Sequence, residues 1–166
     1  MAVFWRPQMS VGNTLVDNDH RYLLCLVNVI ELGLASGGNP DVLKLTLQQL
    51  VDYTHEHFAR EEKLQLKVRY PGYAEHKAEH QELLAKLEQA RDRILDLAQG
   101  GAAAGGSGEV TSEELGALLA DDAPAVGRRP EQDELVRLLR EWILEHVLTT
   151  DIKLKPYLSR YPENLL

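Results

Sequence analysis

The side chains in this sequence that could do chemistry are its histidines, which recur at helical spacing beside carboxylates. His57 lies four residues before Glu61, and His76 lies four residues before His80. On an α-helix this spacing places two side chains on the same face, one turn apart. Imidazole and carboxylate are both common metal ligands, so each pair could bind one metal ion or bridge two.

The candidate ligands fall on apolar faces. His76 and His80 continue a stripe of leucines, and His146 continues the stripe that contains Trp142. A buried, ionised carboxylate such as Glu61 is costly unless it has a partner. A metal ion is one such partner, and a network of hydrogen bonds is another.

His55 provides an internal comparison among the six histidines. It lies two residues from His57, so it points away from that face, and we expect it at the surface. A single buried histidine is usually a hydrogen-bonded core residue, and one histidine pair is weak evidence for a metal. The combination over several segments favours a metal site over a purely structural bundle.

Four long segments with apolar residues at helical spacing must position these side chains. They run from about Asp19 to Ser36, from Pro40-Asp41 to just before Pro71-Gly72, from Tyr73 to Gly100-Gly101, and from Pro130-Glu131 to near Pro156. We expect Asp17 or Asp19 to cap the first segment. No segment alternates with period two, so the predicted fold is all-α, an antiparallel up-down-up-down four-helix bundle.

A long connection separates the third and fourth segments. Residues 99–130 begin with the linker-like QGGAAAGGSG, and Thr111 and Glu114 fit a capping box that predicts a short helix over 112–120. We interpret the connection as a flexible surface insertion without a chemical role. The alternative is that its leucines dock on the bundle or on a partner. The length suits a single domain over 1–166.

Composition narrows the classes of protein. The formal net charge of −8 argues against nucleic-acid binding, which needs a basic patch. The N-terminus is not typical of a signal peptide, and charges interrupt every apolar run, so we expect no membrane span. The one cysteine, Cys25, fits a reducing compartment, and we expect a cytoplasmic protein with Cys25 as a small buried core residue.

The order and spacing of these residues resemble the hemerythrin family, especially its bacterial single-domain members. The similar stretches are DNDH around His20, HFAREE from His57, HKAEH from His76, WILEHVLTTD from Trp142, and an entry segment with Trp5 and Val11-Gly12. The resemblance covers the chain except the insertion. Asp19 stands where the family often has glutamine or glutamate, and Asn13 stands where the family usually has an apolar residue.

The resemblance implies a non-haem centre of two iron ions with a bridging oxo or hydroxo group. His76, His80 and His146 match the three imidazoles of the six-coordinate iron. His20 and His57 match the two imidazoles of the five-coordinate iron. Glu61 and Asp151 match the two bridging carboxylates.

One spacing needs a local change of geometry. His146 and Asp151 are five residues apart, which on an ideal α-helix separates them by about 140°. We therefore expect a local widening of the helix, or a frayed helix end, that lets Asp151 reach the site.

The resemblance implies reversible dioxygen binding, for oxygen transport, storage or delivery. It implies that no side chain needs to act as an acid or a base. We therefore expect that the protein is not an enzyme. Oxygen-activating di-iron bundles commonly use four glutamates and two histidines. A site with more nitrogen and less negative charge should disfavour cleavage of dioxygen. We expect an apolar pocket wall that keeps the site dry. Its candidates are Leu24, Phe58, Trp142 and Ile143.

Two functional alternatives remain. The same residues could serve a di-iron enzyme that handles peroxide, nitric oxide or ferrous iron. They could also serve an oxygen or redox sensor that signals through protein contacts. Dioxygen is the expected partner, and the sequence identifies no protein partner.

Overall fold

The computed structural model describes residues 2–101 and 130–165, and within these ranges every regular element is a helix. The long helices are α1 (Thr14–Ala35), α2 (Pro40–Lys67), α3 (Tyr73–Gly101) and α5 (Pro130–Glu145). Short turns flank them: η1 (Pro7–Met9), η3 (His146–Thr150), η4 (Asp151–Leu154) and α6 (Lys155–Leu158). The short helix predicted over 112–120 lies outside the described residues.

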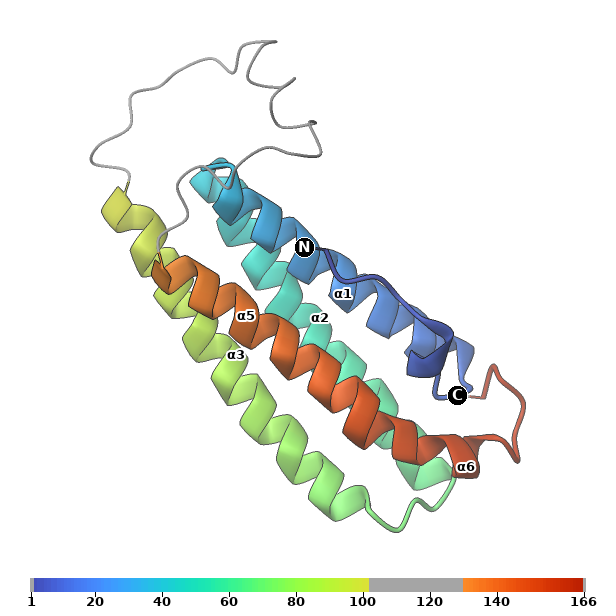
Figure 1. The fold of residues 1–166 in the computed structure, drawn as a ribbon. Helices are drawn as coiled ribbons and strands as arrows, with labels where there is room; N and C mark the ends of the chain where they lie inside the picture. The colour runs from blue at the N-terminus through green and yellow to red at the C-terminus, as the bar shows by residue number, and fades with distance from the viewer. Residues whose placement is uncertain (1, 102–129, 166) are drawn as a thin grey trace.

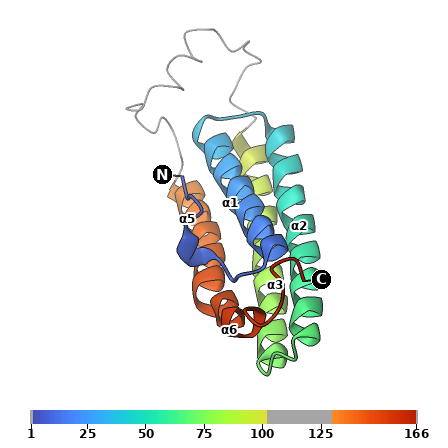
Figure 2. The same ribbon diagram turned by 90° about the vertical axis from the view of Figure 1, so that its right-hand side faces the viewer.

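The four long helices form an antiparallel bundle (Figure 1). Helix α1 packs on α2 and α5, and α3 packs on α2 and α5, so consecutive helices are neighbours. The N-terminal segment lies along α1, and the C-terminal tail returns to the start of α1 (Figure 2). There the backbone N–H of Thr14 donates to the carbonyl of Glu163 at 2.7 Å. The predicted four-helix bundle is confirmed.

Helix α1 begins five residues earlier than predicted, because Asn13 caps it. The Asn13 side-chain oxygen accepts from the backbone N–H groups of Leu15 and Val16, at 3.1 and 3.2 Å. This satisfies two amides that have no partner within the helix. The predicted caps were wrong: Asp17 instead accepts from the N–H of Val11 at 2.9 Å and so holds the entry segment.

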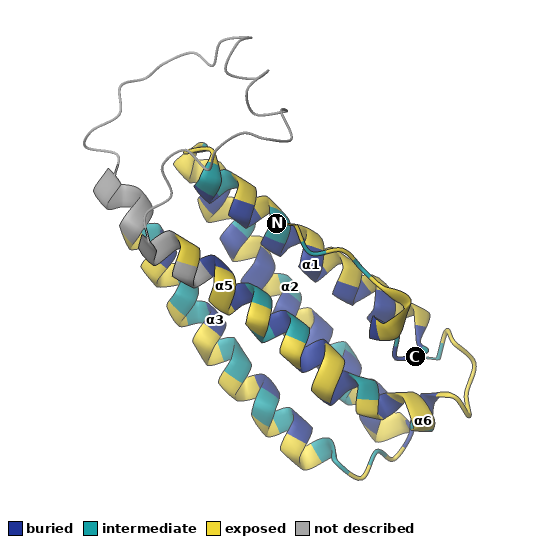
Figure 3. Ribbon diagram, viewed as in Figure 1, coloured by how far each residue is buried: buried dark blue, intermediate teal, exposed yellow. Residues whose placement is uncertain are grey.

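The bundle buries one face of each helix, as the dark bands in Figure 3 show. The largest apolar cluster fills the half of the bundle nearest the α1–α2 turn and includes Val27, Ile30, Leu47 and Leu50. A smaller cluster, with Val11, Val16, Leu64, Leu154 and Leu158, closes the opposite end. Each fully buried side chain of this size contributes about 1.5–3 kcal/mol. Polar side chains are buried between the two clusters.

Two surface predictions had opposite outcomes. His55 is exposed and lies 3.6 Å from Glu88, which confirms that it points away from the face of His57. Cys25 is also exposed, so the prediction of a buried core residue was wrong. Leu24 and Leu26 on either side of it are buried, and the face of α1 that points inward passes through them. None of the described helices is long and apolar enough to cross a bilayer.

Candidate metal centre

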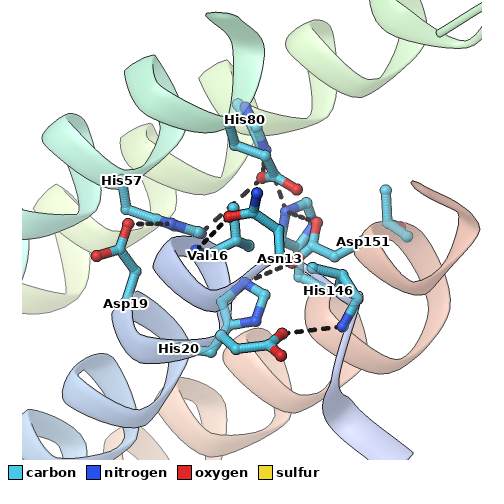
Figure 4. Close-up of polar contacts among 12 residues, drawn as sticks. Asn13, Val16, Asp19, His20, His57, His80, His146 and Asp151 are labelled. Atoms are coloured by element: carbon cyan, nitrogen blue, oxygen red, sulfur yellow. Dashed lines mark hydrogen bonds and ion pairs between the residues drawn. The ribbon is translucent and has the colours of Figure 1, made fainter. Parts of the chain in front are cut away.

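Seven polar side chains meet between the two apolar clusters. They come from all four long segments of the bundle, and each is 4% exposed or less. They are His20 from α1, His57 and Glu61 from α2, His76 and His80 from α3, His146 from η3 and Asp151 from η4. Figure 4 shows side chains from these separate helices pointing toward one another. The structure thus brings together every residue that the sequence analysis named as a ligand.

The seven side chains form two groups that share Asp151. In the three-histidine group, ligand atoms of Glu61, His76, His80, His146 and Asp151 lie within 4.8 Å of one another. In the two-histidine group, ligand atoms of His20, His57 and Asp151 meet the same limit. Two adjoining groups with one shared carboxylate are the arrangement that a pair of metal ions needs.

Distances within the three-histidine group are short. The Nε2 atom of His146 lies 3.0 Å from Asp151 Oδ1, and that of His76 lies 3.2 Å from the same oxygen. The Nε2 atom of His80 lies 3.3 Å from Glu61 Oε2. Nitrogen and oxygen donors therefore surround one small volume.

The second oxygen of the Asp151 carboxylate faces the two-histidine group. The Nε2 atom of His20 lies 3.1 Å from Asp151 Oδ2. The Nε2 atom of His57 lies 3.9 Å from Glu61 Oε2, one turn along α2. Asp151 thus presents a different oxygen to each histidine group, as a bridging carboxylate must.

A wide helical turn brings Asp151 to the site. Residues His146–Thr150 form a π-helix, in which the backbone N–H of Asp151 donates to the carbonyl of His146. A π-turn contains one more residue than an α-turn, and it is frequently found at functional sites. The local widening predicted from the five-residue spacing is confirmed.

Several of these buried atoms have no hydrogen-bond partner among the described residues. They include both oxygens of Glu61, both oxygens of Asp151, and both ring nitrogens of His20 and of His76. Some lie close to a donor or acceptor, such as His20 Nε2 at 3.1 Å from Asp151 Oδ2, but without forming a hydrogen bond. Buried polar groups are rarely left unpaired. A metal ion would account for them, and donors of nitrogen and carboxylate oxygen suit iron.

Without metal, the site contains opposite charges held together. Burial raises the pKa of Glu61, but the neighbouring imidazoles outweigh it and lower that pKa to about 2. Burial lowers the pKa of His76, but Asp151 and Glu61 outweigh it and raise that pKa to about 10. A metal ion must therefore displace protons when it binds.

His57 behaves differently from His76. Burial is the dominant cause, and it lowers the pKa of His57 although Asp19 lies close. A neutral imidazole is the form that binds a metal, so this ring is ready to act as a ligand.

Carboxylates outside the two groups support three of the histidines, and the sequence analysis did not predict this role. The Nδ1 atom of His57 lies 3.4 Å from Asp19, that of His80 lies 3.2 Å from Glu62, and that of His146 lies 2.9 Å from Glu79. Such contacts fix the ring orientation and the tautomer of a metal-binding histidine. The signal was present in the sequence: each carboxylate is adjacent in sequence to a proposed ligand, as DH, EE and EH.

Asp19 has the most partners of the three. It accepts from the Tyr53 hydroxyl at 2.7 Å and from Arg60 Nε at 2.9 Å, and it also faces His57 (Figure 4). Burial raises its pKa, but the hydrogen bonds from His57, Arg60 and Tyr53 outweigh this and lower it to about 2. Asp19 therefore remains ionised and ties α1 to α2 beside the site.

Aromatic rings cover parts of the centre. Phe58 stacks on His80 with ring centroids 3.7 Å apart, and its ring also lies 5.4 Å from His57 and 5.5 Å from His146. Trp5, from the entry segment, lies 6.1 Å from the ring of His20. Phe58 thus contacts both histidine groups, which supports its predicted place in the pocket wall.

The other predicted pocket residues lie in two settings. Leu24 and Ile143 are buried in the larger apolar cluster. Trp142 lines a groove of about 530 Å³ between α3 and α5, together with His146, Glu79 and leucines of both helices. The structure therefore places Trp142 in the same groove as His146 of the three-histidine group.

Fold and site together define a class: a four-helix bundle with a buried histidine and carboxylate cluster that could hold a metal. The family model described as the hemerythrin HHE cation binding domain matches residues 11–158. This chain therefore belongs to the hemerythrin family, whose domain implies iron binding.

Individual relatives are distant. A bacteriohemerythrin of Stenotrophomonas maltophilia is 28% identical over 115 residues, which is 69% of this chain and 67% of that protein. A bacteriohemerythrin of Pseudomonas paraeruginosa is 24% identical over 147 residues, 89% of this chain and 75% of that protein. A myohemerythrin of Sipunculus nudus is 29% identical over 87 residues, 52% of this chain and 67% of that protein. No solved structure gives a significant match.

Proposed function

We propose that this chain binds dioxygen reversibly at two iron ions held by the seven buried side chains. The observation that carries the proposal is the pair of adjoining ligand groups that share Asp151. In this assignment His76, His80 and His146 hold one iron, and His20 and His57 hold the other. Glu61 and Asp151 would be the carboxylates shared by the two irons, and an oxo or hydroxo group would complete the centre. Iron, when bound, supplies the electrons that dioxygen takes up on binding and returns on release.

Ligand number favours dioxygen binding at the two-histidine group. That group has two imidazoles where the other has three, so an iron held there would have room for an external ligand. Phe58 and Trp5 lie against its rings and limit the access of water. In this proposal no side chain of the protein acts as a general acid or base, and the chain is an oxygen carrier rather than an enzyme. The single domain and the cytoplasmic location stay predictions.

The proposal is tested by oxygenation of the reduced, iron-loaded protein. The chain is reduced without air, exposed to dioxygen, and then evacuated, while its visible absorption is followed. We expect a coloured form that appears with dioxygen and disappears under vacuum over repeated cycles. Irreversible oxidation in the first cycle, or turnover of added peroxide or nitric oxide, would contradict an oxygen carrier and support the enzyme alternative.

A further inference from the structure

Glu79 of α3 connects the two ends of the π-helix η3. Its Oε1 atom accepts from the Nδ1–H of His146 at 2.9 Å and from the hydroxyl of Thr150 at 2.9 Å. His146 is the first residue of η3, and Thr150 is the last, directly before Asp151. One carboxylate oxygen thus contacts both boundaries of the turn that separates two proposed ligands.

The π-helical turn η3 needs contacts from another element to hold its conformation. A π-helix is rare, and its five residues would otherwise relax toward the α-helical spacing of α5 before it. At α-helical spacing His146 and Asp151 would lie about 140° apart. The turn must therefore be held if both residues are to reach the same pair of metals.

Glu79 differs in this respect from the other supporting carboxylates. Asp19 and Glu62 each contact one histidine, and their remaining partners lie on α2 or α3. Glu79 is 40% exposed, so filling the core does not account for its position. Thr150, in contrast, is buried, and its hydroxyl points to Glu79.

We propose that Glu79 is a positioning residue that orients the His146 ring and, through Thr150, fixes the turn that presents Asp151. The inference rests on the proposed function, because it takes both residues as iron ligands. Glu79 therefore sets one histidine of the three-histidine group and the carboxylate shared by both groups. Its neighbour His80 is itself a proposed ligand. Residues 79 and 80 of α3 would therefore act together on three proposed ligands, which are His80, His146 and Asp151.

The test measures how fast iron leaves the loaded protein when a strong chelator is added. We expect Glu79→Ala to increase the release rate about 10–100-fold, which is the usual effect of losing a supporting partner of a metal ligand. Glu79→Gln should stay within about threefold of the wild type, because its amide oxygen accepts the same two hydrogen bonds. Release from Glu79→Gln as fast as from Glu79→Ala would overturn the positioning role.

Thr150 variants test the link to the turn. Thr150→Val should speed iron release, and Thr150→Ser, which keeps the hydroxyl, should not. The double variant Glu79→Ala with Thr150→Val should release iron no faster than Glu79→Ala alone, because both remove the same link. Effects that multiply independently would overturn the link.

A control and a reference separate the possible failures. Glu82→Ala removes a carboxylate of α3 that is 67% exposed and ion-paired with Lys86, so it should leave the release rate unchanged. Wild-type protein that binds no iron would contradict the proposed function itself. If the wild type binds two irons but Glu79→Ala releases iron at the same rate as the wild type, only the inference about Glu79 is contradicted.

Discussion

The backbone N–H of Asp151 donates to the carbonyl of His146, five residues earlier in the chain. This single wide turn places both side chains on the inner side of the bundle, with His146 Nε2 3.0 Å from Asp151 Oδ1. Asp151 is then the one residue that belongs to both ligand groups. The turn therefore decides whether the two groups adjoin.

Replacing Asp151 by asparagine should leave at most one iron per chain where the wild type has two. Asparagine keeps the shape but loses the negative charge that both groups use. The measurement is elemental analysis of purified, reconstituted protein. Asp52→Asn is the matched control, since Asp52 accepts a hydrogen bond from Gln48 on the exposed side of α2. Two irons in Asp151→Asn would remove Asp151 from the site.

His57 and His55 form a matched pair on α2. His57→Gln should lower the iron content and abolish reversible oxygenation, because it leaves the two-histidine group with one imidazole. His55→Gln should change neither, because His55 is exposed and lies beside Glu88 instead. Equal iron content and equal oxygenation in the two variants would contradict the assignment.

Iron removal should lower the melting temperature by about 10 °C or more. Binding at a metal concentration about 1,000-fold above Kd stabilises the folded state by about 4 kcal/mol, and 1 kcal/mol shifts the melting temperature of a domain this size by about 2–4 °C. Thermal unfolding of the iron-loaded and the chelator-treated protein checks this. Equal melting temperatures would show that no metal is bound in the folded state.

The Asp19 network should contribute to stability whether or not metal is present. Asp19→Ala should lower the free energy of unfolding by about 2–4 kcal/mol, because it leaves Arg60 without its buried partner. Tyr53→Phe removes one hydrogen bond to Asp19 and should cost about 1 kcal/mol. Chemical denaturation of the metal-free proteins gives both values. A larger loss in Tyr53→Phe than in Asp19→Ala would contradict the central place of Asp19.

Acid should weaken the contact between α1 and α5. Burial raises the pKa of Glu31, but its bond with Arg140 outweighs this and lowers the pKa below 4.5. A lowered pKa in the folded state means that the stabilisation is present above about pH 4.5 and is lost as the pH falls through the folded-state value. Glu31→Gln should therefore cost about 1–3 kcal/mol at pH 7 and less at pH 3.

Metal-free protein is the right sample for this comparison, because acid also displaces iron. The free energy of unfolding of the wild type and of Glu31→Gln is measured at both pH values. A difference between the two proteins that stays constant from pH 7 to pH 3 would contradict the lowered pKa.

The bundle and the two spaced pairs were predictable because both depend on helical periodicity, whereas the full set of seven ligands was implied by the resemblance to the hemerythrin family. His76 and His80, or His57 and Glu61, share a helix face whatever the details of packing. The wide turn before Asp151 was also predictable once the resemblance had implied that His146 and Asp151 are both ligands, since their five-residue spacing then requires it. The shared face of each pair follows from spacing within one helix.

Features that depend on contacts between distant segments were not predictable in the same way. The cap of α1 is Asn13, and its amide also donates to the carbonyl of Leu165 at the far end of the chain. The exposure of Cys25 depends on which face of α1 turns inward. The pairing of Glu79 with Thr150 joins α3 to η3, and a single sequence shows neither partner opposite the other.

Elemental analysis of the purified protein, loaded with ferrous iron without air and freed of excess metal, tests the central claim most directly. Seven converging ligands in two groups predict two iron ions per chain. One iron per chain, or none, would contradict the assignment of both groups as iron sites.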